Sequence, residues 1–78
     1  MSQTIQISVN LFASFTRGRF KTAKQSHPTG TRIADIIREL GIAEPEVGII
    51  MVNGRRAEPD HQLTDRARLA LFPLIGGG

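Results

Sequence analysis

The sequence predicts an α+β fold in which one main helix packs against a mixed sheet of four to five strands. Two observations support this fold class. Residues 5–11 alternate apolar and polar side chains, the pattern of a strand with one buried face. Residues 31–42 instead space isoleucine and leucine three and four positions apart, as in a helix with one apolar stripe. With 78 residues, the chain forms one domain or part of one.

The N-terminal third predicts two antiparallel strands joined by a wide connection. In the first strand, the apolar positions are Ile5, Ile7, Val9 and Leu11. Residues 13–19 break the alternation and contain a glycine, so we expect a connection there. Residues 20–26 predict a second, more polar strand, which ends at the turn sequence of residues 27–30.

The helix has recognisable start and stop signals. Thr31 is the expected N-cap, and Ala34 in the third position after it excludes a capping box there. Gly41 is suited to the left-handed C′ position, with Ile42 folding back on Ile37 in a Schellman ending. The apolar stripe consists of Ile33, Ile36, Ile37 and Leu40.

The C-terminal half predicts a hairpin and a last strand. The apolar run 48–52 precedes Asn53-Gly54, a pair suited to a type I′ turn, and the chain should return through residues 55–57. A polar connection follows, in which Leu63 is the one apolar residue expected to anchor the segment. It leads to a strand over residues 67–72, which ends at Pro73. In that strand Leu69 and Leu71 share one face, and Arg68, Ala70 and Phe72 share the other.

One helix covers one face of a sheet, so the opposite face should meet solvent or a partner. We therefore expect a folded domain over residues 1–73 and a flexible tail over 74–78. Three glycines end that tail, and terminal glycine adds nothing to the stability of a fold.

The composition excludes several chemistries. The chain contains no cysteine, which rules out disulfides, zinc-thiolate sites and thiol nucleophiles. No stretch is long and apolar enough to cross a bilayer, and residues 1–4 do not resemble a signal peptide, so we expect a cytoplasmic protein without a membrane partner. His27 and His61 lack metal-ligand spacing, and Glu44 and Glu46 flank a proline in a predicted loop. We expect no metal site and no catalysis by this chain alone.

The positive charge is concentrated near the N-terminus. The net charge is +3, and no acid precedes Asp35. Such a field attracts nucleic acid or an acidic protein surface; the alternative is a solvated basic loop and edge strand. No aromatic RNA-stacking motif accompanies the charge, so we do not expect nucleic acid binding.

The order of the predicted elements resembles the β-grasp fold of ubiquitin. Three segments further resemble the MoaD/ThiS family of sulfur carrier proteins: VNLFASFTR at 9–17, VNGRR at 52–56 and FPLIGGG at 72–78. The family's tail commonly runs Phe-Pro-Pro-Val, a small residue and Gly-Gly. Here Leu74 replaces the second proline, which should leave the tail less stiff, and Asp65-Arg66-Ala67 replaces the usual Asp-Gly-Asp.

The resemblance implies a carrier function in cofactor biosynthesis, with the molybdopterin type favoured. A ubiquitin-activating-like adenylyltransferase would use ATP to adenylate Gly78, and sulfur from a persulfide would then replace AMP to leave a thiocarboxylate. A sulfur-accepting synthase, of the molybdopterin synthase large subunit type, would take that sulfur. The chain itself would bind no cofactor. The alternative is a ubiquitin-like modifier that is conjugated to lysines through Gly78.

The same resemblance assigns roles along the tail. Gly78 is the activated residue, and the residues expected to thread into partner sites are Gly77, Gly76, Ile75 and Leu74. The uncovered sheet face beside the tail and the positive charge, rather than the resemblance, indicate the residues expected to dock partners: Phe72, Pro73, Arg68, Phe12 and Arg17. If the first and last strands pair, both phenylalanines share one face; the alternative is that one of them folds under a loop into a secondary core.

Overall fold

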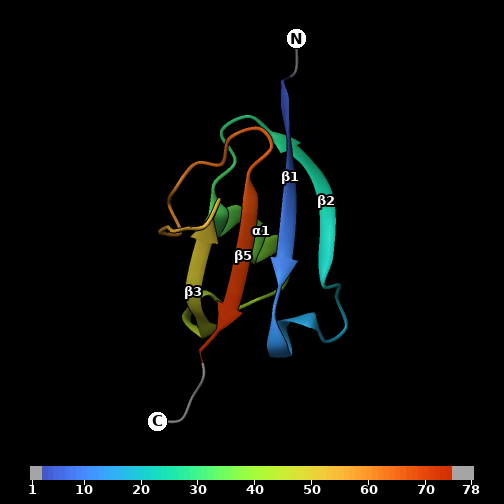
Figure 1. Cartoon of the computed structure of the whole chain (residues 1–78), viewed down its shortest axis with the longest axis vertical. Helices are drawn as coiled ribbons and strands as arrows, with labels where there is room; N and C mark the ends of the chain where they lie inside the picture. Colours follow the sequence, from blue (N-terminus) through green and yellow to red (C-terminus); the bar gives the residue numbers. More distant parts are fainter. Residues whose placement is uncertain (1–2, 75–78) are drawn as a thin grey trace.

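The computed structural model describes residues 3–74 and contains a five-stranded sheet with one α-helix (Figure 1). The strands are β1 (Thr4–Leu11), β2 (Thr22–Pro28), β3 (Val47–Val52), β4 (Arg55–Arg56) and β5 (Arg68–Pro73). The helix is α1 (Ile33–Glu39), and two short 3-10 helices, η1 (Ala13–Thr16) and η2 (Glu44–Glu46), lie in connections. No helix among residues 3–74 has the length and hydropathy needed to cross a membrane.

The sheet is mixed and has the order β2-β1-β5-β3-β4. Its two central strands, β1 and β5, are parallel, with Val9 opposite Leu69 and Leu11 opposite Leu71. The other three pairs are antiparallel. The parallel pair points both strands toward the same end of the molecule, where β5 leads into the C-terminal segment (Figure 1). The predicted α+β fold class is confirmed.

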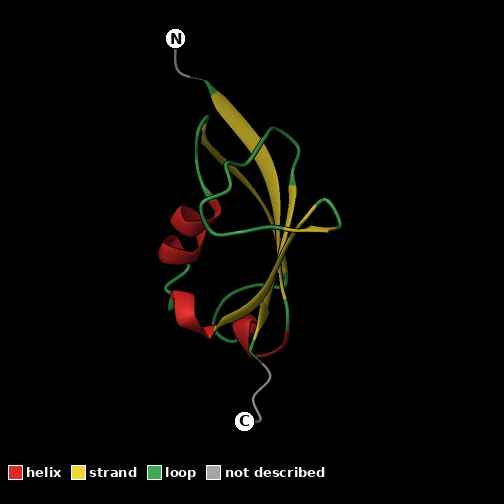
Figure 2. Ribbon diagram, turned by 90° about the vertical axis from the view of Figure 1, so that its left-hand side faces the viewer, coloured by secondary structure: helices red, strands yellow, loops and turns green. Residues whose placement is uncertain are grey.

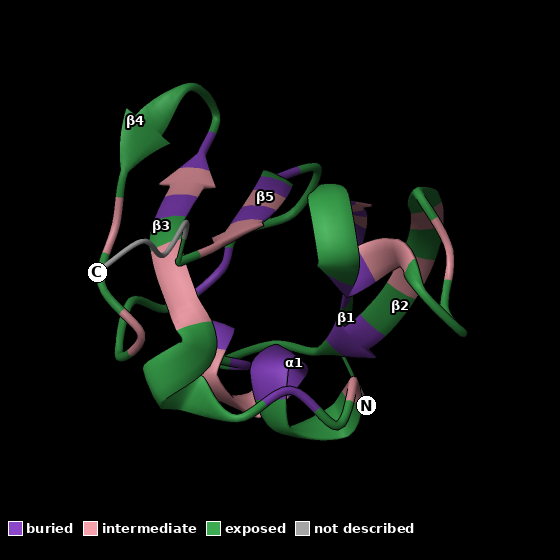
Figure 3. Ribbon diagram, turned by 90° about the horizontal axis from the view of Figure 1, so that it is seen from below, coloured by how far each residue is buried: buried purple, intermediate pink, exposed green. Residues whose placement is uncertain are grey.

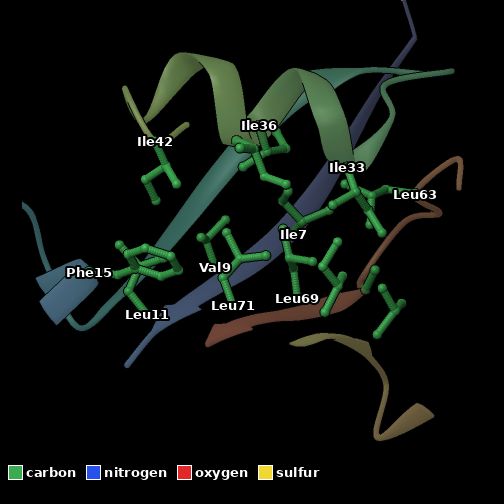
Figure 4. Packing of buried hydrophobic residues seen from close by; sticks show 14 of the residues in the cluster. Ile7, Val9, Leu11, Phe15, Ile33, Ile36, Ile42, Leu63, Leu69 and Leu71 are labelled. Atoms are coloured by element: carbon green, nitrogen blue, oxygen red, sulfur yellow. The ribbon is translucent and has the colours of Figure 1, made fainter. Parts of the chain in front are cut away.

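The core lies between α1 and one face of the sheet (Figures 2 and 4). Seen from below, the strands carry buried bands that alternate with more exposed ones (Figure 3). The predicted stripe and strand positions supply most of the core, which contains Ile5, Ile7, Val9, Leu11, Ile33, Ile36, Ile37, Ile50, Val52, Leu69 and Leu71. Only Leu40 of the predicted stripe is partly buried and packs at the edge. One helix therefore covers one face, as the sequence predicts.

The helix begins one residue later than predicted. The N-cap is Arg32, whose backbone N–H donates to the Asp35 Oδ2 at 2.9 Å. Thr31 instead donates its hydroxyl to the Pro28 carbonyl oxygen at 2.7 Å. The first free helix N–H groups, of Ile33 and Ala34, donate to carbonyl oxygens of the long connection before β5. Because that connection satisfies them, no hydroxyl cap is needed.

The end of the helix agrees with the prediction. Gly41 has a φ of 74°, and the Ile42 N–H donates to the Ile37 carbonyl oxygen at 3.2 Å. This is the 6→1 hydrogen bond of a Schellman motif. The predicted Asn53-Gly54 hairpin is also present, with φ values of 52° and 80°.

Two connections differ from the prediction. Residues 13–16 form η1, which the sequence did not indicate, and Phe15 on it is only 4% exposed and closes one end of the core (Figure 4). The second strand covers Thr22–Pro28 rather than 20–26. His27, placed in a turn by the sequence, lies opposite Ile5 and is buried, so the ladder continues to that point.

A candidate docking face and the base of the C-terminal segment

The face of the sheet opposite α1 is defined by strand register. Paired residues in neighbouring strands point to the same side. Phe72 lies opposite Ile49, Ala70 lies opposite both Asn10 and Met51, and Arg68 lies opposite Ser8. These positions alternate with buried ones, so they point away from the helix. We call this side the outward face.

Apolar side chains gather at the end of the outward face where β1 and β5 finish. This apolar patch consists of Phe12, Ile49, Met51, Ala70 and Phe72. The rings of Phe12 and Phe72 stack with centroids 4.3 Å apart and an interplanar angle of 11°. Phe12 remains 41% exposed and Ile49 40% exposed. The alternative that either ring folds into a secondary core is therefore wrong for Phe12.

Exposed aromatic and aliphatic groups that touch one another are a recognised feature of binding sites, since water contact with them is unfavourable. The stack also restricts both rings before any partner arrives, and a phenylalanine has only two side-chain torsions to order. The patch is thus a preorganised apolar contact surface.

Cations border the patch. Arg68 lies two positions before Ala70 on β5, and Arg56 lies opposite Met51; both are exposed. Lys24, opposite Ser8 on β1, is also exposed and lies farther along the same face. Among residues 3–74, the outward positions of the five strands hold no aspartate or glutamate. The acids of the chain lie in α1, η2 and the connection before β5. The outward face is therefore apolar at one end, cationic around it, and suited to an acidic counterpart.

The C-terminal segment leaves the sheet beside this patch. Pro73 lies opposite Val47, whose side chain packs against the core, so Pro73 does not join the outward face. The Leu74 N–H donates to the Glu46 carbonyl oxygen at 2.9 Å, while the residue is 63% exposed. The sequence predicted less stiffness where Leu74 replaces a proline. A proline has no N–H and could not make this hydrogen bond, which holds residue 74 by other means.

The structure brings together some of the predicted docking residues and separates others. Phe12, Phe72 and Arg68 share the outward face. Arg17 lies after η1 in the connection to β2, outside the strand register that defines the face. The predicted activation and threading positions 75–78 lie outside the described residues.

Sequence reasoning missed three residues of this face, namely Ile49, Met51 and Arg56. The signal was present in the unbroken apolar run before the Asn-Gly turn. A strand with only one buried face needs no apolar side chain on the other, so Ile49 and Met51 could have been assigned to a second contact surface.

No other arrangement in the described part of the chain suggests chemistry. The His27 Nε2 donates a hydrogen bond to the Gln25 Oε1 at 2.7 Å, and its Nδ1 lies 3.9 Å from the Glu39 Oε2. Within residues 3–74, no three histidine, aspartate or glutamate side chains gather as metal ligands would. The outward face and the segment that leaves it are the candidate site.

Comparison with protein families decides what kind of protein carries this face. The sequence model of the ThiS family matches residues 9–78, which is most of the chain and includes the terminal glycines. The chain belongs to the ThiS family. ThiS-family proteins are ubiquitin-like sulfur carriers rather than catalysts, and they act with activating enzymes and sulfur-accepting synthases. No curated protein sequence matches the chain.

Solved structures confirm the β-grasp fold of this ThiS-family chain. A putative molybdopterin converting factor, subunit 1, from Pyrococcus furiosus is 26% identical, with a TM-score of 0.72 over 91% of this chain and 99% of that one. The small archaeal modifier protein 1 of Haloferax volcanii is 18% identical, with a TM-score of 0.73 over 91% of this chain and 99% of that one.

Proposed function

We propose that this protein carries sulfur as a thiocarboxylate on Gly78. The observation that supports this most directly is the juxtaposition at one end of the sheet. There, an exposed apolar patch lies beside the base of a segment that ends in Gly77-Gly78, in a chain of the ThiS family. The patch supplies binding and the segment supplies the reacting group.

The chemistry explains why a partner is needed. A carboxylate carries a negative charge and is a poor electrophile, so its oxygen must first attack the α-phosphorus of ATP, with pyrophosphate leaving. The terminal sulfur of a persulfide then attacks the carbonyl carbon and AMP leaves. A thiol then attacks the donor's sulfur in the resulting acyl disulfide, so that a disulfide forms between the thiol and the donor and the thiocarboxylate leaves. An activating enzyme would supply ATP and the sulfur donor, and a synthase would accept the sulfur.

The residues of this chain contribute a narrow end and a docking surface. Glycine has no Cβ, so the terminal residues fit a channel shaped around the reacting carbonyl. Ordering each terminal residue in that channel costs about 1–2 kcal/mol of backbone entropy, so the affinity must come from elsewhere. Phe12 and Phe72 supply it by burial in the partner, and Arg68 steers association toward an acidic surface. Arg17 stays a predicted contributor to the same steering.

Molybdopterin biosynthesis is the pathway that we favour. The support is the 26% identity to the putative molybdopterin converting factor subunit of Pyrococcus furiosus over 91% of the chain. A modifier conjugated to lysines through Gly78 is the second candidate, and the fold similarity to the small archaeal modifier protein 1 gives it support at the level of fold.

Intact mass spectrometry tests the proposal. The full chain is incubated with the activating enzyme of its own organism, ATP and a persulfide donor. We expect the mass increase that accompanies replacement of one oxygen by sulfur, located at Gly78. A chain that lacks Gly78 is the matched control; it should fold normally and show no increase. An unchanged mass of the full chain, with an enzyme active in ATP–pyrophosphate exchange, would contradict the proposal. Stable higher-mass conjugates on denaturing gels would favour the modifier.

A further inference from the structure

The base of the C-terminal segment, residues 73–74, lies alongside β3 at a glycine that has no space for a side chain. A Cβ built on Gly48 would lie 2.9 Å from the Pro73 carbonyl oxygen and 3.0 Å from the Leu74 Cα and backbone nitrogen. These neighbours are backbone atoms, so none can turn aside as the end of a flexible side chain can. Gly48 does not have the positive φ of the turn glycines. Position 48 thus needs glycine because another backbone approaches closely.

The ladder between β3 and β5 is irregular at the same point. Val47 lies opposite Pro73 and Ile49 lies opposite Phe72, so Gly48 is an extra residue on β3. Such a bulge bends a strand locally. Two residues before Gly48, the Glu46 carbonyl oxygen accepts the hydrogen bond from the Leu74 N–H. We call these contacts, between residues 46–48 and residues 73–74, the tail clamp.

We propose that Gly48 is a positioning residue, whose missing side chain lets the tail clamp set the direction in which the C-terminal segment leaves the sheet. This inference rests on the proposed function, since the direction matters only if Gly78 reacts in a partner. Four residues follow Leu74. At about 3.3 Å each, they place the reacting carboxylate within about 13 Å of it.

The short span explains why direction should affect the reaction. Phe72, which belongs to the apolar patch, precedes Leu74 by two residues. A partner that holds the patch therefore receives the carboxylate from a nearly fixed starting point, and a fixed direction raises its effective concentration at the reacting atoms. Misplacement by about 1 Å can cost up to about a hundredfold in rate.

A methyl group at position 48 should disturb the clamp and spare the patch. The closest contact would have to open by about 0.5 Å, from 2.9 Å to the 3.4 Å at which ordinary van der Waals contact begins. The cheapest movement takes Pro73 and Leu74 away from β3 and lengthens the hydrogen bond to Glu46. Phe12 and Phe72 should keep their stack, and Phe72 should keep its pairing with Ile49.

The experiment compares the full wild-type chain with Gly48→Ala and the matched control Gly54→Ala. Gly54 lies in the hairpin after β3 with a φ of +80°, and a Cβ there would meet nothing within 4 Å. The control therefore adds the same methyl group and costs stability without touching the tail clamp. Three quantities are measured: amide hydrogen exchange at Leu74 by NMR, the Kd for the activating enzyme, and kcat for adenylation.

We expect Gly48→Ala to speed exchange at Leu74 and lower kcat, each by about tenfold or more, while Kd changes by less than about threefold. Gly54→Ala should keep the wild-type exchange at Leu74, the Kd and kcat. A wild-type kcat in Gly48→Ala, a loss of kcat matched by an equal weakening of Kd, or an equal loss in Gly54→Ala would each overturn the inference.

Two further outcomes also decide. If Gly48→Ala does not fold, exchange in the wild-type chain tests the clamp: a protected Leu74 amide supports it, and exchange at the rate of an unstructured amide overturns it. If the wild-type chain is not adenylated by a demonstrably active enzyme, the proposed function fails, and the Leu74 exchange still judges the tail clamp by itself.

Discussion

Replacing Phe12 with alanine separates the role of this ring in docking from its role in folding. Phe12 is 41% exposed in the free chain, and its ring stacks on that of Phe72 at 4.3 Å. Complete burial of a phenylalanine contributes about 1.5–3 kcal/mol, so the part of Phe12 that is buried contributes about 1–2 kcal/mol. The stack adds about 0.5–1.5 kcal/mol. The free energy of unfolding should therefore fall by about 1.5–3.5 kcal/mol.

The control is Phe15→Ala, three positions along the chain. Phe15 is 4% exposed and fills the end of the core, so its removal should cost about 3–5 kcal/mol of stability. Urea denaturation measures both losses. If burial alone decided behaviour, Phe15→Ala would be the more damaging variant in every assay.

Binding should rank the two variants in the opposite order. A central aromatic residue of an interface typically contributes 2 kcal/mol or more, so Phe12→Ala should weaken the Kd for the activating enzyme about thirtyfold. Phe15→Ala should leave the Kd within about threefold under conditions in which it is folded. Isothermal titration calorimetry, with folding of each variant verified by circular dichroism, gives the comparison. A folded Phe12→Ala with wild-type affinity would refute the assignment of the patch.

Two more predictions concern charge and the helix end. Arg68→Glu should slow association with the activating enzyme and make the association rate less dependent on salt. Arg38→Glu on α1, away from the outward face, is the control and should change neither the rate nor its salt dependence. Stopped-flow measurements at two ionic strengths test this, and equal effects of the two variants would count against an acidic counterpart for this face. Gly41→Ala should lower the free energy of unfolding by about 1–2 kcal/mol, because alanine at a φ of 74° is strained; an unchanged urea midpoint would show that the Schellman ending is not needed.

The local elements were predictable because their signals lie within a few residues. Alternation over residues 5–11 gives β1, the stripe from Ile33 to Leu40 gives α1, and Asn53-Gly54 gives the hairpin, since each pattern matches one backbone period or one turn type. The N-cap was the exception. The first N–H groups inside the helix, those of Ile33 and Ala34, donate to carbonyl oxygens of the connection before β5, far along the chain, and no rule based on neighbouring side chains includes these partners.

The candidate site likewise has one part that the sequence predicts and one part that depends on strand pairing. The terminal Gly77-Gly78 pair and the residues before it can be recognised directly in the sequence, and the match to the ThiS family extends to this pair. Phe12 and Phe72 could be assigned to one face only on the condition that β1 and β5 pair. That pairing joins segments about sixty residues apart and depends on how the whole chain folds. Ile49 and Met51 join the patch through a second such pairing.

Gly48 shows the limit most clearly. In the sequence it is one glycine before an apolar run, and no turn or positive φ distinguishes it. Its importance comes from two backbone atoms of residue 74 and one of residue 73, which approach it only when β5 lies against β3. Periodicity and local turns were settled by the order of the amino acids, because their causes are steric and short in range. The shared face and the close approach were settled by folding, because strand pairing alone brings distant residues into contact.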